Sequence, residues 1–253
     1  YVGMGRNLYD NSPEAKAVFD QAEKILPGMN LKKLCFEGPI EELTQTANSQ
    51  VAILVTSVAA LHALNTWVKG EGLRVDACAG LSLGEYSALV ASSVLEFSDA
   101  VRLVRHRGEL MEKAALKNPG VMASILGISI EDLQEVCKES NAEIANLNSP
   151  GQIVISGKKE SVQKAMALAE QKGAKKCILL NVSGPFHSSF MKDAAEEFKK
   201  ELDKTKFSNP GIPVVANVTA DYEKSAEEIK ENLVKQVYNP VRWEESVRRI
   251  SQQ

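Results

Sequence analysis

The sequence predicts an α/β fold in which a core with a largely parallel sheet carries an inserted ferredoxin-like module. Across the 253 residues, apolar runs of strand length alternate with amphipathic helical stretches, as in proteins built around a parallel sheet. Within residues 119–185 these elements follow the order β-α-β-β-α-β, which is typical of a ferredoxin-like module. We therefore assign residues 1–118 and 186–253 to the core and residues 119–185 to the inserted subdomain.

The helices of the first part are predicted from their caps and apolar faces. Ser12 and Pro13 suit the first positions of a helix that Pro27–Gly28 ends. The long apolar stretch from about Asn48 predicts a helix buried in protein, because several polar residues interrupt it as they would not in a membrane span. A short strand at 75–80 then leads into helices at 84–93 and 98–114.

The rest of the chain is predicted in the same way. Strands of the inserted module are expected at residues 121–127, 142–148, 151–157 and 175–182, with helices at residues 129–139 and 159–173. The core then resumes with a helix at 187–204, a strand at 212–219, and helices at 225–238 and 239–250. Pro240 suits the first turn of the last helix.

Composition and charge exclude several classes of function. With a net charge of −3, neither nucleic acid nor an anionic membrane is an expected partner. The four cysteines lie far apart without a C-x-x-C pair, which fits neither a zinc site nor a secreted disulfide framework and indicates a reducing compartment. The opening residues also lack the pattern of a signal peptide. We expect a soluble, cytoplasmic protein with no metal site.

The stretch Gly80-Leu81-Ser82-Leu83-Gly84 matches G-x-S-x-G, the strand-to-helix turn that exposes a nucleophilic serine. Small residues on both sides of the serine let the chain turn sharply without collision. The turn places Ser82 at a helix N-terminus, where the backbone N–H of Leu83 can stabilise a developing oxyanion. The alternative interpretation is that Ser82 is an ordinary helix N-cap.

A serine nucleophile normally needs a base, and the chain has three histidines. His62 falls inside the predicted buried helix, and the arginines on either side of His106 lower its basicity. His187 follows a Gly-Pro-Phe turn that can present its ring to a cleft, so elimination favours it. The alternative is a helix-start histidine with no partner. No acidic residue stands out as its orienting partner, which favours a Ser-His dyad steadied by a backbone carbonyl.

Longer motifs resemble those of one enzyme family. In chain order they are GLSLGEYSALV, RLVRHRG, NSPGQIVISG, VSGPFHSSFM and KQVYNPVRW. Together, and at this spacing along essentially the whole chain, they resemble the malonyl-CoA:acyl carrier protein transacylase family. The resemblance implies an α/β hydrolase-like core with a ferredoxin-like subdomain, in agreement with the fold predicted above.

The resemblance also implies roles for individual residues. Ser82 would be the acylated nucleophile and His187 its base, with the backbone carbonyl of Gln236 steadying the histidine. Arg107 would pair with the free carboxylate of the malonyl group, a task that suits the rigid fork of a guanidinium. Phe186 would form the wall that limits acyl size. Without the resemblance, Arg107 is better interpreted as a solvated surface cation.

The implied activity is transfer of a malonyl group from malonyl-CoA to the phosphopantetheine thiol of acyl carrier protein, through an acyl-serine, for fatty acid or polyketide synthesis. It needs no metal or redox cofactor, and its partners are acyl carrier protein and coenzyme A thioesters. Because the carrier is acidic, basic residues should surround the cleft, and the candidates are Lys158, Lys159, Lys192 and Arg242. Two alternatives remain: a serine esterase or thioesterase, and a non-catalytic domain that docks the carrier.

Overall fold

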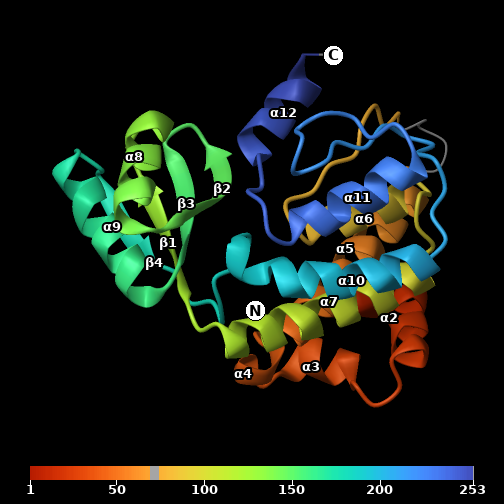
Figure 1. Ribbon diagram of the computed structural model, residues 1–253. Coiled ribbons are helices and arrows are strands. Elements are labelled where there is room, and N and C mark those ends of the chain that lie inside the picture. The colour runs from red at the N-terminus through yellow and green to blue at the C-terminus, as the bar shows by residue number, and fades with distance from the viewer. Residues whose placement is uncertain (69–73, 253) are drawn as a thin grey trace. The chain divides into compact units, whose positions relative to one another are not determined.

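The computed structural model describes residues 1–68 and 74–252, and the chain divides into two compact units (Figure 1). Unit 1 comprises Tyr1–Glu109, Glu201–Val214 and Glu223–Glu227. Unit 2 comprises Leu110–Lys200, Val215–Tyr222 and Glu228–Gln253. The chain therefore passes between the units several times, and the predicted boundaries at residues 118/119 and 185/186 stay a prediction.

Unit 1 is built mainly from helices. In chain order these are α1 (Arg6–Asn11), α2 (Pro13–Ile25), α3 (Leu31–Glu37), α4 (Ile40–Leu43), α5 (Thr46–Trp67), α6 (Gly84–Ala91) and the first part of α7 (Phe97–Lys117). As predicted, Ser12 caps α2: its hydroxyl accepts the Ala15 N–H at 3.2 Å, and Pro13 is the first helical residue. Local cap chemistry was therefore sufficient to place the start of this helix.

Helix α5 is long and apolar enough to cross a membrane by length and composition alone, and 44% of its most apolar window is buried inside the protein. Its buried residues lie between Thr46 and Ala59, where it packs against α2 and α6. Its last turns, by contrast, expose His62, Leu64 and Trp67. The predicted burial is thus correct for the first part of the helix and wrong for the end, including His62.

The largely parallel sheet expected in the core is not borne out in the described residues. The predicted strands at 75–80 and 212–219 meet in unit 1 through one parallel bridge, Cys78 with Val214, and the Cys78 N–H donates to the Pro213 carbonyl at 2.7 Å. Pro213 has no N–H to extend the ladder, and the tight turn around Ser82 begins shortly after Cys78. Pairing therefore stops before a strand forms.

Unit 2 contains a four-stranded antiparallel sheet in the order β2-β3-β1-β4. Its elements are β1 (Val121–Leu126), α8 (Ile130–Ser140), β2 (Glu143–Ser149), β3 (Gln152–Gly157), α9 (Lys159–Gln171) and β4 (Lys176–Leu179). This β-α-β-β-α-β order agrees with the sequence prediction. The Ser129 hydroxyl accepts the Asp132 N–H at 3.1 Å, which caps α8 as predicted.

The two faces of this sheet bury different side chains. Ala123, Ile125, Ile153 and Ile155 point to the face that both helices cover, and α8 and α9 complete that core with residues such as Leu133 (Figure 1). On the opposite face, a smaller cluster is formed by Met122, Ala145, Val154, Leu180 and Phe186. Alternation along each strand thus gives the sheet two apolar faces, and the second one receives the loop that carries the predicted base.

The C-terminal part supplies a 3₁₀ turn at Ser189–Met191 and the helices α10 (Lys192–Lys204), α11 (Ala226–Gln236) and α12 (Trp243–Ser251). The last helix begins at Trp243, so the prediction that it starts at 239, with Pro240 in its first turn, is wrong. Val241 instead forms a parallel bridge with Asn146 of β2. This pairing holds the residues before α12 in an extended conformation, where backbone hydrogen bonds to the sheet outweigh local helix signals.

Candidate active site

Ser82 lies on a strained turn directly before α6. Its φ is 50°, in the left-handed region that residues with a Cβ rarely adopt, as expected for a serine elbow. A Cβ on Gly80 would overlap the backbone of Gly84, so the turn requires glycine at position 80. A Cβ on Gly84 would meet nothing within 4 Å, so the predicted need for a small side chain after the serine is wrong.

The backbone beyond the serine provides donors at the helix start. Leu83 is the N-cap of α6, so Ser82 does not occupy the cap position that the alternative interpretation gave it. The Gly84 and Glu85 N–H groups donate to the carbonyls of Leu81 and Ser82 at 2.8 and 3.1 Å. Among residues 1–68 and 74–252, no backbone carbonyl accepts the Leu83 N–H. This N–H is available for the oxyanion role predicted from the sequence.

Arg107 is buried next to the serine. Only 1% of the residue is exposed, and its Nη2 donates to Ser82 Oγ at 3.1 Å. The guanidinium carbon also lies 5.5 Å from the centre of the Tyr86 ring. Burial lowers the pKa of Arg107, and the neighbouring Tyr86 and Glu85 oppose that effect. A guanidinium stays charged in such surroundings, so a cation lies beside the serine hydroxyl.

The surface-cation interpretation describes Arg102, which is exposed on α7 and pairs with Asp99 at 3.1 Å. Arg105 is half-buried; it pairs with Glu109 at 2.6 Å and also donates to Asn48 of α5 at 2.8 Å. Arg107 faces inward because α7 lies close to α5 at the next residue: a Cβ on Gly108 would be 2.6 Å from the Ala47 Cα. This close approach between helices brings Arg107 to Gln50.

Gln50 is a residue of the site that the sequence analysis missed. It is 7% exposed on α5, and its Oε1 accepts a hydrogen bond from Arg107 Nη1 at 2.5 Å. This contact fixes one end of the guanidinium fork, while Nη2 points to the serine. The sequence feature that could have identified Gln50 is its position as a glutamine among the apolar residues on the buried side of a long helix. A buried side-chain amide needs a polar partner, and such a position therefore predicts one.

His187 lies in unit 2, on the loop that precedes α10. The residue is 5% exposed, and its φ of 54° is also left-handed. Its Nδ1 lies 2.8 Å from the carbonyl oxygen of Gln236, the last residue of α11. A carbonyl only accepts, so Nδ1 carries the proton and Nε2 is the basic nitrogen of the neutral ring. The histidine therefore has the partner that the alternative interpretation denied it.

The helix end explains why a carbonyl is available there. The last carbonyls of an α-helix have no partner within the helix, and they take donors from elsewhere. Gln236 is fully buried, so the contact is shielded from water. The other histidines differ: His62 is exposed on α5, and His106 lies near Glu109 at the surface, with 3.9 Å between Nδ1 and Oε2.

Phe186 precedes the histidine and is half-buried against Met122, Ala145 and Val154 on the second face of the sheet. Of the predicted site residues, unit 1 thus holds Ser82, Leu83 and Arg107, while unit 2 holds Phe186, His187 and Gln236. In the described parts of the chain, no cluster of His, Cys, Asp and Glu has the composition of a metal site.

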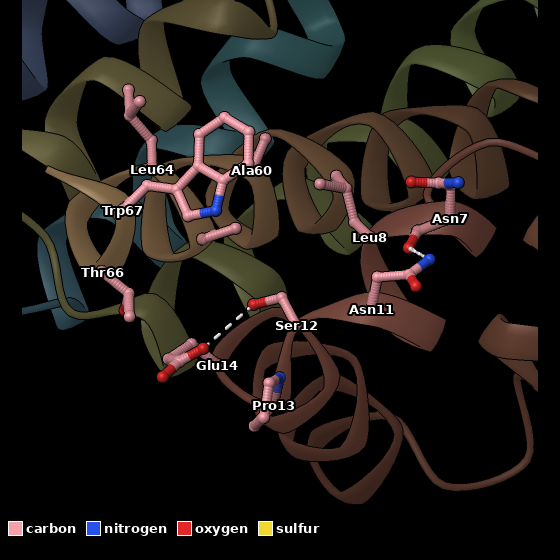
Figure 2. Close-up of a pocket in the computed structure, with 11 residues that line it drawn as sticks. Asn7, Leu8, Asn11, Ser12, Pro13, Glu14, Ala60, Leu64, Thr66 and Trp67 are labelled. Atoms are coloured by element: carbon pink, nitrogen blue, oxygen red, sulfur yellow. Dashed lines mark hydrogen bonds between the residues drawn. The ribbon is translucent and has the colours of Figure 1, made fainter.

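A cavity of about 540 Å³ lies elsewhere in unit 1. Figure 2 shows residues that line it: Leu64 and Trp67 on α5, Leu8 on α1, and Ser12, Pro13 and Glu14 at the start of α2. The Ser12 hydroxyl donates to Glu14 at 3.0 Å there. None of the predicted site residues lines this cavity, and most of its lining is apolar.

The comparisons with known proteins bear on the whole chain. A family model described as the acyl transferase domain matches residues 1–253. The chain belongs to the acyl transferase family. Among curated acyl transferases, the malonyl CoA-acyl carrier protein transacylase of Bacillus subtilis (strain 168) is 48% identical over 255 residues, which cover 99% of this chain and 79% of that protein.

Solved structures of acyl transferases share the fold. An acyl carrier protein S-malonyltransferase from Vibrio cholerae superposes with a TM-score of 0.93 at 39% identity, covering 100% of this chain and 83% of that one. A malonyl-transacylase solved in complex with its type II PKS acyl-carrier protein gives a TM-score of 0.94 at 41% identity, covering 100% and 82% of the two chains. These similarities agree with the α/β class predicted from the sequence.

Proposed function

We propose that this protein transfers a malonyl group from malonyl-CoA to the phosphopantetheine thiol of acyl carrier protein. The observation that carries the proposal is the 3.1 Å contact between Arg107 Nη2 and Ser82 Oγ. It puts a buried cation beside a strained serine, and a malonyl thioester has a free carboxylate close to its reacting carbonyl. Family membership and the names of the relatives support the same substrate class.

In the first half-reaction, Ser82 Oγ attacks the thioester carbonyl and His187 Nε2 takes the hydroxyl proton. The Leu83 N–H donates to the oxyanion that forms. The carbon–sulfur bond then breaks, His187 gives its proton to the coenzyme A sulfur, and malonyl-serine remains. The Nδ1–H bond to the Gln236 carbonyl holds the ring in the required tautomer.

In the second half-reaction, the carrier thiol loses its proton to His187 and attacks the malonyl-serine. The carbon–oxygen bond breaks, and Ser82 recovers the proton. Arg107 holds the malonyl carboxylate throughout, with its fork oriented by Gln50. The thioester supplies the activated acyl group, so this reaction needs no metal or redox cofactor.

Phe186 takes the role of a wall that limits acyl size. Residues 119–185 act as an inserted ferredoxin-like subdomain, the core is hydrolase-like, and the protein works in the cytoplasm. The assignments of Phe186, the subdomain and the core rest on the sequence motifs, and the cytoplasmic location rests on the four widely spaced cysteines. The element order β1-α8-β2-β3-α9-β4 supports the subdomain, and the contact of Phe186 with the sheet supports a fixed position for its ring.

The docking site for the carrier is assigned to two of the four predicted basic residues. Lys158 and Lys159 line a cavity of about 570 Å³ together with Glu160 and with Lys117, which pairs with Asp193 at 2.7 Å. Arg242 instead pairs with Glu245 and donates to the Thr219 carbonyl at 3.0 Å, and Lys192 lies 6.0 Å from the Tyr238 ring centre. The adjacent exposed lysines Lys158 and Lys159 suit an acidic partner.

The deciding experiment is intact mass after brief exposure to malonyl-CoA, with Ser82→Ala as the control. A malonyl adduct that requires Ser82 and disappears when carrier protein is added supports the transferase. Loss of the adduct to water alone would indicate an esterase or thioesterase. Carrier binding without any adduct would indicate a non-catalytic docking domain.

A further inference from the structure

The loop after His187 is fastened to strand β2 through Ser189. Glu143 is the first residue of β2. One of its carboxylate oxygens accepts the Ser189 backbone N–H at 2.9 Å, and the other accepts the Ser189 hydroxyl at 2.5 Å. The carboxylate thus takes both donors of a residue two positions after the histidine. A charged acceptor that binds two donors fixes orientation as well as distance.

The backbone at His187 needs support of this kind. Its φ of 54° is disfavoured for a residue with a Cβ, and such conformations persist only where the surroundings determine them. Other contacts lie within the loop itself. The Ser188 hydroxyl donates to the Pro185 carbonyl at 2.5 Å, and the N–H groups of Phe186 and Met191 donate to the carbonyls of Gly184 and Ser188, both at 3.0 Å. Glu143, in contrast, precedes Ser189 by 46 residues and belongs to the sheet.

Strand β2 also holds the segment that orients the histidine ring. The Leu147 N–H donates to the Val241 carbonyl at 2.8 Å, and the Val241 N–H to the Ala145 carbonyl at 2.9 Å. Val241 lies shortly after Gln236, whose carbonyl receives the Nδ1–H of His187. Strand β2 therefore anchors two segments. It holds the segment after Gln236 through Ala145 and Leu147, and it holds the loop after His187 through Glu143.

We propose that Glu143 is a positioning residue for acyl transfer. By clamping Ser189 to β2, it keeps the His187 ring where Nδ1 reaches the Gln236 carbonyl and Nε2 is presented for proton transfer. This inference rests on the proposed function, in which His187 is the base. Glu143 acts through the loop and leaves substrate binding to other residues, so its loss slows the chemical step and spares affinity.

The first test is single-turnover acylation of Ser82 by malonyl-CoA, followed by quenched-flow intact mass. Glu143→Ala should lower the maximal rate about tenfold, the loss expected for a charged hydrogen-bonded contact, with an unchanged half-saturating concentration. Ser189→Ala should lower it less, because the backbone N–H of residue 189 keeps its bond to Glu143. The double variant should lose no more than Glu143→Ala alone, because Glu143→Ala already removes both hydrogen bonds of the contact. Glu143→Gln should recover most of the rate, since an amide can accept the N–H and donate to the hydroxyl.

The matched control is Glu139→Ala. Glu139 is an exposed carboxylate of α8 in the same unit, 3.6 Å from Lys164, and its removal changes the net charge equally. It should leave the acylation rate as it is in the wild type. If Glu143→Ala does not fold, as judged by its melting curve, Ser189→Ala and Glu143→Gln still test the clamp, because they keep part of the contact.

The second test is the ¹⁵N spectrum of the ring nitrogens, which reports the tautomer and is simple to assign with three histidines. His187 should be the Nδ1–H tautomer in the wild type and a mixture in Glu143→Ala. A Glu143→Ala protein with the wild-type rate and tautomer would refute the clamp, while the proposed function stands. If the wild type forms no Ser82 adduct, the proposed function fails, and an unchanged tautomer in Glu143→Ala would then overturn the clamp separately.

Discussion

Replacing Arg107 by methionine removes the guanidinium while keeping most of the side-chain volume. The residue is 1% exposed, and its two terminal nitrogens contact Gln50 and Ser82. In the proposed reaction, leaving a buried malonyl carboxylate without its charged partner reduces the stabilisation of the transition state by about 2–5 kcal/mol. At about 3 kcal/mol, kcat/KM for malonyl-CoA should fall roughly 150-fold. Acetyl-CoA has no carboxylate to bind, so its transfer should change little.

The informative quantity is the ratio of malonyl to acetyl transfer, measured as kcat/KM with the same carrier protein. Arg102→Met is the matched control, because Arg102 lies on the same helix, is exposed, and pairs with Asp99 at its surface. Replacing Arg107 also removes the hydrogen bond that Gln50 Oε1 accepts, at a cost in stability of about 1–3 kcal/mol, while removal of a buried charge offsets part of that cost. Melting curves of the variant separate this change in stability from the change in kcat/KM. An equal loss for both acyl groups would refute the carboxylate role of Arg107.

Three further outcomes are expected. Gly80→Ala should lower the melting temperature and abolish labelling of Ser82, because its methyl group overlaps the Gly84 backbone. The methyl group of Gly84→Ala meets open space, so this variant should keep the wild-type melting temperature and labelling. Equal effects of the two variants would contradict the steric account. In steady-state assays, the KM for carrier protein should rise with salt concentration, and the double variant Lys158→Ala/Lys159→Ala should show a weaker rise. A KM that does not change with salt would exclude a basic docking site. Burial raises the pKa of the Cys35 thiol to about 12, so the folded protein keeps a proton that the unfolded chain releases above about pH 9. The contribution of the thiol to the free energy of unfolding is therefore complete below that pH and is lost as the pH rises. In urea unfolding, the stability of Cys35→Ala should decline less steeply with pH than that of the wild type.

Local signals predicted a large part of the fold. The cap at Ser12 and the strand alternation of residues 119–185 depend on neighbouring residues in the chain, and the structure agrees with both. The parallel sheet and the start of the last helix depended on pairing between distant segments. Pro213 cannot donate to a ladder, and Val241 pairs with β2. Sequence periodicity contains no information about either partner.

The candidate site divides in the same way. The turn pattern and the elimination of the other histidines selected Ser82 and His187, and their catalytic roles stay predictions. The left-handed backbone of both residues and the contact of His187 Nδ1 with the Gln236 carbonyl are consistent with those roles. The inward direction of Arg107 required the close approach of two helices at Gly108, and Gln50 was missed for the same reason. Both positions acquire their meaning from a contact between α5 and α7, which no local pattern reports.

The acceptor that holds His187 belongs to the main chain of Gln236. Every amino acid supplies the same carbonyl, so this group is invisible to point mutation: a substitution at position 236 alters the packing of a fully buried side chain and leaves the acceptor in place. The orienting partner of the base is therefore encoded by where α11 stops, and inherited with the length of that helix. An ester in place of the amide that follows Gln236 would weaken this oxygen as an acceptor, and a control must account for the Val237 N–H that it also removes, which donates to the Val234 carbonyl at 3.4 Å.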